Sequence, residues 1–517
     1  MRKIRNIFLN LLLVFALICA AFPLSACSSP RDGGAYSLAE ESSQTPSDPE
    51  PEPALPAFGS YEEAEKAIYA LKRAKFETGA YDRSQIADFE NACVDAVMYL
   101  RHNKEDEDYL QKCFELYCVM YEKYNAVQYL TGDVPRVYIN TSYDIREDKY
   151  VKCTVSLVDK TGGALEPVKD TSALIKIRGN STAGADKKPY NVKLSADTNV
   201  FGMESGSKWA LLANHFDKTL IRNKLAFDLA AKAGGYATPD SRFCEVYLNG
   251  KLLGSYLVCE PVTDGKHRAN IDTEAGEFMV ERVKAWASPV SESVTTSRLE
   301  LRFDIEYGKS RSGIAAVLNA AEDAVISGDE TEIRKYVDID SFAAMYITHE
   351  LLKDCDLTYG STYLCCKDGK LYFGPLWDMD LSAGNVSVLH PEEKYYIYNN
   401  TPPYGDCSGD SASGLWARQD WFEYLCKCPF FMQKIGEEYA RLTPFIESLY
   451  AKGGYIDSLV AEYGASFARN YGDAGWELRG HASPYESHTD YSSYEQAVNE
   501  LKDWLRRRHE FLKKEFE

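Results

Sequence analysis

The hydrophobic pattern of this 517-residue chain changes from a helical period to a strand period at about Asp133. Over residues 61–130 apolar side chains recur every three to four positions, the spacing of one face of an α-helix. Over residues 137–157 apolar and polar residues alternate, the spacing of a strand with one buried face. This order favours an α+β fold that is preceded by a small all-α helical bundle.

Short strands and helices follow one another after this point, without a repeat of fixed length. The expected strands and hairpins lie at residues 173–177, 190–194, 243–260 and 363–373. The expected helices lie at residues 220–233, 314–352 and 416–516. A loop rich in Gly, Ser, Thr and Lys connects the first two strands, so the backbone there is open to ligands.

The first 26 residues have the composition of an export signal. Three cations precede an apolar stretch over residues 7–22, which is short for a membrane-spanning helix. Leu-Ser-Ala-Cys follows at 24–27 and matches the lipobox of bacterial lipoproteins. We therefore expect cleavage after residue 26 and diacylation of Cys27. Two acyl chains would tether the protein to the outside of the cell membrane.

Three further segments are expected after the signal peptide. Residues 27–59 are rich in Ser, Pro and Glu and poor in apolar residues, which predicts a disordered linker after the lipidated Cys. Residues 60–132 form the predicted helical bundle, in which we find no motif for chemistry. The remaining domain is expected over residues 134–517.

Composition argues against two classes of function. The chain carries 58 Lys and Arg against 78 Asp and Glu, a net charge of −20, so we expect no nucleic-acid partner. None of its 14 cysteines forms a C-x-x-C motif, which argues against a zinc ribbon. The pairs Cys365-Cys366 and Cys426/Cys428 are open to two readings, disulfides in an exported protein or buried apolar thiols.

Two acidic segments stand out because their apolar neighbours predict burial. Asp354 and Asp356 follow the end of a predicted helix, and Asp378 and Asp380 follow a predicted strand. A buried carboxylate is costly unless a cation compensates its charge. Closely spaced carboxylates are also the groups that hold magnesium beside phosphates. Each Asp alone is typical of a helix cap or a turn, but together the two segments predict a metal site.

Several runs of residues resemble a known family. They are Ile-Arg-Gly-Asn-Ser-Thr at 177–182, Lys-Lys-Pro-Tyr-Asn-Val-Lys-Leu at 187–194, Leu-Ile-Arg-Asn-Lys-Leu-Ala at 220–226 and Trp-Asp-Met-Asp-Leu at 377–381. In this order, over about residues 134–450, the chain resembles the spore coat protein H (CotH) kinase family. The resemblance implies an atypical protein kinase with a diverged kinase-like α+β fold. Such a kinase would use ATP and Mg²⁺ to phosphorylate Ser residues of exported or coat proteins.

The resemblance also implies roles for individual residues. Asp378 would be a magnesium ligand supported by Asp380, and Asp356 would be the catalytic base or a second metal ligand. Lys193 would hold the α- and β-phosphates of ATP, with Lys188 as the alternative. The other residues implied to contact phosphate or to organise the site are Arg178, Asn180, Ser181, Arg222 and Asn223.

Two functions from different classes remain open at this point. The first is an active extracytoplasmic kinase with a Ser-rich protein substrate. The second is a catalytically inactive surface binding or adhesion lipoprotein that keeps the kinase-like scaffold. The family often has Asn at the positions of Asp354 and Ser361, which favours the second function, whereas Asp378 and Asp380 favour the first.

Overall fold

The computed structural model describes residues 57–74, 83–127, 132–159, 171–266, 268–283, 292–354, 356–357, 360–386, 411–480 and 491–516. The predicted signal peptide, Cys27 and all but the last three residues of the predicted linker lie outside these ranges. Within them, none of the helices is long and apolar enough to cross a membrane. Helices and sheets are both abundant, so the fold is α+β.

Three helices come first in the described chain: α2 (Tyr61–Lys72), α3 (Arg83–His102) and α4 (Tyr109–Ala126). The Ser60 side chain caps α2 by accepting the N–H of Glu63 at 3.2 Å. The three helices pack on one another through one hydrophobic cluster. Its fully buried members include Ala64, Ile68, Ala96, Leu100, Cys113 and Met120.

Seven strands close into a barrel in the order β1-β2-β3-β4-β5-β7-β6. The pairs are antiparallel, except that β1 and β6 run parallel where they close the barrel. The strands are β1 (Arg136–Asn140), β2 (Val151–Val158), β3 (Thr171–Ile177), β4 (Tyr190–Thr198), β5 (Gly206–Leu212), β6 (Ser241–Leu248) and β7 (Lys251–Cys259).

Alternation along β3 and β4 decides which side chains fill the barrel. Ile175 and Val192 lie opposite each other and are buried in its core. Leu174 and Lys193 form the neighbouring pair on the outer face, where Leu174 is 38% exposed. All seven strands contribute apolar side chains to the core.

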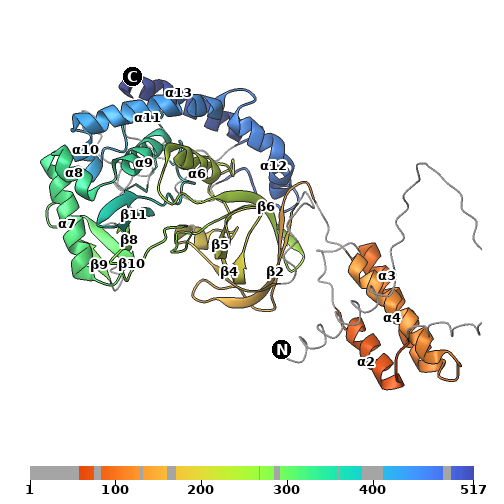
Figure 1. Cartoon of the computed structure of the whole chain (residues 1–517). Coiled ribbons are helices and arrows are strands. Elements are labelled where there is room, and N and C mark those ends of the chain that lie inside the picture. The colour runs from red at the N-terminus through yellow and green to blue at the C-terminus, as the bar shows by residue number, and fades with distance from the viewer. Residues whose placement is uncertain are drawn as a thin grey trace, which may run out of the picture. The chain divides into compact units, whose positions relative to one another are not determined.

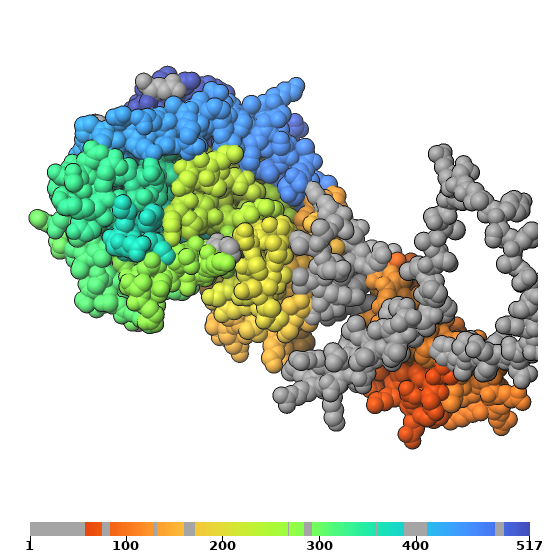
Figure 2. Space-filling view, in the orientation of Figure 1, coloured from red at the N-terminus to blue at the C-terminus, as the bar shows by residue number. Residues whose placement is uncertain are grey.

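A second, antiparallel sheet has the strand order β12-β11-β8-β10-β9. Its strands are β8 (Phe278–Val283), β9 (Ser293–Thr295), β10 (Arg302–Tyr307), β11 (Thr362–Lys367) and β12 (Lys370–Phe373). β11 and β12 are the predicted hairpin, turned at Asp368-Gly369 with positive φ at both residues. Figure 2 shows residues of β8 to β10 in green and of β11 and β12 in turquoise, beside barrel residues in yellow. The second acidic segment follows β12 directly.

Helices pack around these sheets (Figure 1). They are α5 (Ser181–Gly184), α6 (Arg222–Ala233), α7 (Arg311–Ser327), α8 (Glu330–Tyr336), α9 (Ile339–Leu352), α10 (Trp421–Leu425), α11 (Pro429–Tyr450), α12 (Tyr455–Tyr471) and α13 (Tyr494–Phe516). α6, α11 and α13 pack on α9, and α12 packs on β7. The C-terminal helices therefore contact both the barrel and the helical core.

The segment expected to be helical over 314–352 forms three helices in the structure. Gly328, in the left-handed region with a φ of 71°, ends α7. Asp329 and Asp338 then begin α8 and α9, because each side chain accepts an N–H from the first turn of the helix that follows. Gly328 and these two caps therefore mark the breaks between the helices.

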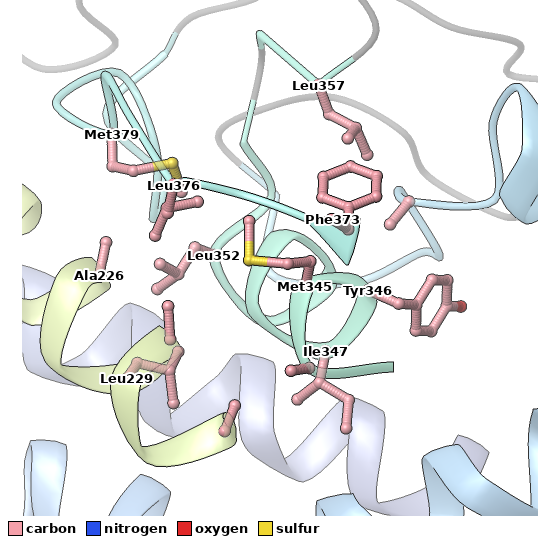
Figure 3. Close-up of a cluster of buried hydrophobic side chains, with 14 of the residues drawn as sticks. Ala226, Leu229, Met345, Tyr346, Ile347, Leu352, Leu357, Phe373, Leu376 and Met379 are labelled. Carbon is pink, nitrogen blue, oxygen red and sulfur yellow. The ribbon is translucent and has the colours of Figure 1, made fainter. Parts of the chain in front are cut away.

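α9 carries apolar residues around its whole circumference and is buried on all sides. Figure 3 shows Met345, Ile347 and Leu352 of this helix beside Ala226 and Leu229 of α6. Leu376 and Met379, which follow β12, belong to the same core. The packing fixes the end of α9 and the segment after β12, and these are the places where the two acidic segments begin.

The cysteines of the described residues are free thiols. Cys365 and Cys366 are neighbours on β11 and both are buried, as is Cys428. In the described part of the chain the interpretation as buried apolar thiols fits Cys365, Cys366 and Cys428, whereas the free thiol of Cys426 is partly exposed.

Candidate functional site

Asp378 and Asp380 line one pocket together with residues from the barrel and from α6. The other residues of its lining are Arg178, Thr182, Pro189, Leu212, Ala213, Asn214, His215 and Asn223. They come from the end of β3 and the loop after it, the end of β5 and the connection to α6, and the first turn of α6. The pocket thus lies where the barrel meets the segment that follows β12.

The environment of the two carboxylates favours a bound cation. Burial raises the pKa of Asp378, which is opposed by the positive charge of Arg178. Burial also holds the pKa of Asp380 well above its usual range, and the nearby charges of Asp378 and Asp356 raise it further. A cation between the carboxylates would offset both their desolvation and their mutual repulsion.

The first turn of α6 holds this acidic segment in place. The Asn223 Oδ1 atom accepts the N–H of Met379 at 2.8 Å. The Arg222 guanidinium donates to the Ser382 carbonyl at 3.0 Å and to the Ala383 carbonyl at 3.2 Å. Both side chains are buried. Arg222 and Asn223 therefore orient the backbone around Asp380.

The charge of Asp356 contributes to the raised pKa of Asp380, after the charges of Asp378 and Asp217. Its backbone N–H donates to Asp354 Oδ1 at 3.1 Å. Asp354 is buried, and its Oδ2 atom lies 2.9 Å from His349 Nδ1. The structure therefore brings the two acidic segments together, with Asp356 partly exposed and Asp354 turned toward α9.

Arg178 is the one predicted phosphate contact among Arg178, Asn180, Ser181, Lys188 and Lys193 that lines the pocket. Its guanidinium carbon lies 4.9 Å from the centroid of the Trp377 ring. Asn180 and Ser181 are exposed at the start of the short helix α5. Neither of them lines the pocket, but the next residue, Thr182, does.

Neither predicted lysine lies in the pocket. Lys193 is on the outer face of the barrel, because β4 alternates and Val192 and Leu194 occupy the inner face. Its Nζ atom lies 4.1 Å from the centroid of the Tyr150 ring. The Lys188 ammonium donates to the Ala183 carbonyl at 2.9 Å. Neither lysine lines this pocket, and the expectation that one of them holds phosphate stays a prediction.

Lys193→Ala is expected to lower the free energy of unfolding by about 1 kcal/mol or less, since the ammonium only stacks on an aromatic ring at the surface. Urea denaturation of the two proteins measures this difference. A loss of several kcal/mol would contradict the outer-face position of Lys193 and would require a buried partner for its ammonium.

Sequence reasoning missed the lysine that is buried beside the pocket, Lys187. Its ammonium donates to the Ala213 carbonyl at 2.8 Å and to Asn470 Oδ1 at 2.8 Å, and also to the Ser255 carbonyl. Burial lowers its pKa well below the usual range. No local pattern in the sequence distinguishes Lys187 from Lys188 or Lys193.

His215 is a second pocket residue without a signal in the sequence. Burial, together with the charges of Lys187 and Lys218, lowers its pKa to about 4. The imidazole is therefore neutral near pH 7. It can donate or accept one hydrogen bond in the pocket but brings no positive charge to it.

The donor set fits magnesium better than a metal held by protein alone. Within the described ranges no group of three or more His, Cys, Asp or Glu side chains is arranged to hold a metal ion. Magnesium is usually bound by one or two carboxylates, with substrate phosphates and water completing its shell. Asp378 and Asp380 provide such a pair.

The protein thus has an α+β fold, with a pocket that contains two carboxylates between a barrel and a helical core. The CotH kinase protein family matches residues 175–512, which is more than half of the chain. The protein therefore belongs to the CotH kinase family. The match begins within β3 and ends within α13, so it contains the whole pocket. No curated protein matches the chain.

Proposed function

We propose that this protein is an extracytoplasmic, ATP- and Mg²⁺-dependent protein kinase that phosphorylates Ser residues of exported, coat or surface proteins. One observation carries the proposal: in a member of the CotH kinase family, Asp378, Asp380 and Arg178 line one pocket. Phosphoryl transfer depends mainly on positioning and on charge stabilisation, for which a metal site beside a cation is suited.

The pocket residues divide into two groups under this proposal. Asp378 and Asp380 hold magnesium, which when bound neutralises charge on the phosphates of ATP. Arg178 and Thr182, from the loop after β3, line the same pocket and would contact these phosphates. Asp356, which is partly exposed, is placed to accept the proton of the Ser hydroxyl of the substrate.

The proposal extends to the rest of the chain. The barrel and the helical part would be the two lobes of a kinase-like fold, with the pocket at their junction. The helices α2 to α4 would form a bundle that precedes this catalytic part. Diacylated Cys27 would anchor the protein outside the cell membrane, with residues 27–59 as a linker to the folded part.

A second candidate function is a surface binding protein that keeps the scaffold without activity. The position of the lysines favours it. The Lys193 ammonium lies over the Tyr150 ring and the Lys188 ammonium donates to the Ala183 carbonyl. The Lys187 ammonium donates to three protein acceptors. A kinase site in which no lysine of the described residues lines the pocket must rely on Arg178 and the metal for phosphate charge.

Nucleotide binding separates these two functions. We expect ATP with Mg²⁺ to raise the midpoint of thermal unfolding, because a ligand at one hundred times its Kd adds about 2.7 kcal/mol to the stability of the folded state. ATP with a chelator is expected to give a much smaller shift. Equal midpoints with and without ATP and Mg²⁺ would favour the binding protein.

A further inference from the structure

A carboxyl group outside the pocket lining, Glu281, is connected to Asp378. Glu281 lies on β8, the central strand of the second sheet, opposite Asp304 of β10 and Tyr363 of β11. Residues that face each other across antiparallel strands share one face of the sheet. Glu281 therefore lies between Asp304 and Tyr363 on one face of the sheet, and the pairing of the three strands fixes its position.

Two hydrogen bonds link Glu281 to the metal-binding segment through Ser361. Glu281 Oε1 accepts the backbone N–H of Ser361 at 2.6 Å. The Ser361 hydroxyl in turn donates to Asp378 Oδ2 at 3.4 Å. Ser361 has a φ of 54°, a left-handed conformation that a serine keeps only when its surroundings hold it.

We propose that Glu281 is a positioning residue for the Asp378 carboxylate, acting through the Ser361 backbone and hydroxyl. The inference rests on the proposed function, since it concerns the binding of magnesium with nucleotide by Asp378. Groups that hydrogen-bond to a metal ligand fix its orientation, and their loss typically lowers metal affinity about 10- to 100-fold. Glu281 acts one step further out, by holding the group that orients the ligand.

The surroundings of Glu281 indicate that position matters more than charge. Burial raises the pKa of Glu281 to about 7, and the Ser361 N–H and Tyr363 oppose this shift. The charges of Glu306 and Asp304, both on β10, raise the pKa further. Near neutral pH the carboxyl group exchanges a proton. It can accept the Ser361 N–H in both forms, because the protonated acid keeps a carbonyl oxygen.

The test compares variants of the full chain by calorimetric titration with Mg²⁺ and ATP. Glu281→Ala removes the acceptor and is expected to weaken binding about tenfold. Glu281→Gln keeps an acceptor oxygen without charge and is expected to bind within about threefold of the wild type. Glu306→Ala removes a neighbouring exposed carboxylate and is the matched control, expected within about twofold.

A second variant, Ser361→Ala, removes the hydroxyl that meets Asp378 and is expected to lose about tenfold as well. Adding Glu281→Ala to it is expected to cause little further loss, because both changes break the same connection. If Glu281→Ala does not fold, Ser361→Ala and Glu281→Gln decide the question. Melting midpoints of all variants confirm folding.

The outcomes separate this inference from the proposed function. Wild-type affinity in Glu281→Ala, or a loss in Glu281→Gln as large as in Glu281→Ala, would overturn the positioning role and leave the proposed function intact. If the wild type itself does not bind ATP with Mg²⁺, the proposed function and this inference fail together.

Discussion

Asp378→Asn is expected to lower Mg²⁺-dependent phosphate transfer by about 10²- to 10³-fold, the effect of removing one preorganised electrostatic group from an active site. Asn keeps the shape of the side chain but loses the charge that holds the cation. Transfer of radiolabelled phosphate from ATP to a Ser-rich protein measures the change.

The same variant is expected to fold as well as the wild type. Burial raises the pKa of Asp378, so the ionised carboxylate costs stability in the metal-free protein, and a neutral amide removes that cost. The control is Asp323→Asn. Asp323 lies on α7 and forms an exposed ion pair with Arg298, so this variant is expected to keep full transfer. Retained transfer in Asp378→Asn would exclude this residue as a metal ligand.

Arg508→Met is expected to lower the free energy of unfolding by about 3–5 kcal/mol, the usual cost of removing one partner of a buried ion pair. Arg508 of α13 and Glu350 of α9 are both completely buried. The guanidinium also donates to the carbonyls of Glu350, Ala412 and Gly414. Glu350 accepts the N–H of Trp416 at 2.7 Å.

Denaturant unfolding, followed by circular dichroism, measures this loss. The control is Arg506→Met on the same helix, because Arg506 pairs with Asp503 and Glu510 at the surface. Its expected cost is about 1 kcal/mol or less. A loss in Arg508→Met no larger than in Arg506→Met would contradict the buried pairing of α13 with α9.

The acidic segments show what local sequence can predict. Leu376, Trp377, Met379 and Leu381 surround Asp378 and Asp380, and such a run of large apolar residues leaves no way to solvate the backbone between them. Burial of this segment follows from composition alone. Its position after a strand also follows, because the hairpin before it has a clear turn at Asp368-Gly369.

The lysines show where sequence reasoning stops. Lys187, Lys188 and Lys193 are equal in charge, and the run that contains them gives no reason to prefer one of them. Lys187 is buried because Asn470 of α12, 283 positions away, accepts from its ammonium. Contacts across such a separation are set by tertiary packing, so no local period or spacing reports them.

The division of the predicted helical segment into three helices has a similar cause. Residues 314–352 carry a nearly continuous helical pattern, while the actual ends depend on Gly328, Asp329 and Asp338. Asp is common both on exposed helix faces and at helix starts. An Asp in the sequence therefore does not by itself show that its side chain accepts a first-turn N–H group.

The most direct test of the proposed kinase activity is phosphate transfer by the mature wild-type chain, measured with radiolabelled ATP, Mg²⁺ and a Ser-rich exported protein. We expect label on Ser residues of the substrate that disappears when magnesium is chelated and returns when it is restored. Absence of label from both the substrate and the protein itself, in preparations shown to be folded, would contradict the kinase and leave the binding protein as the better account.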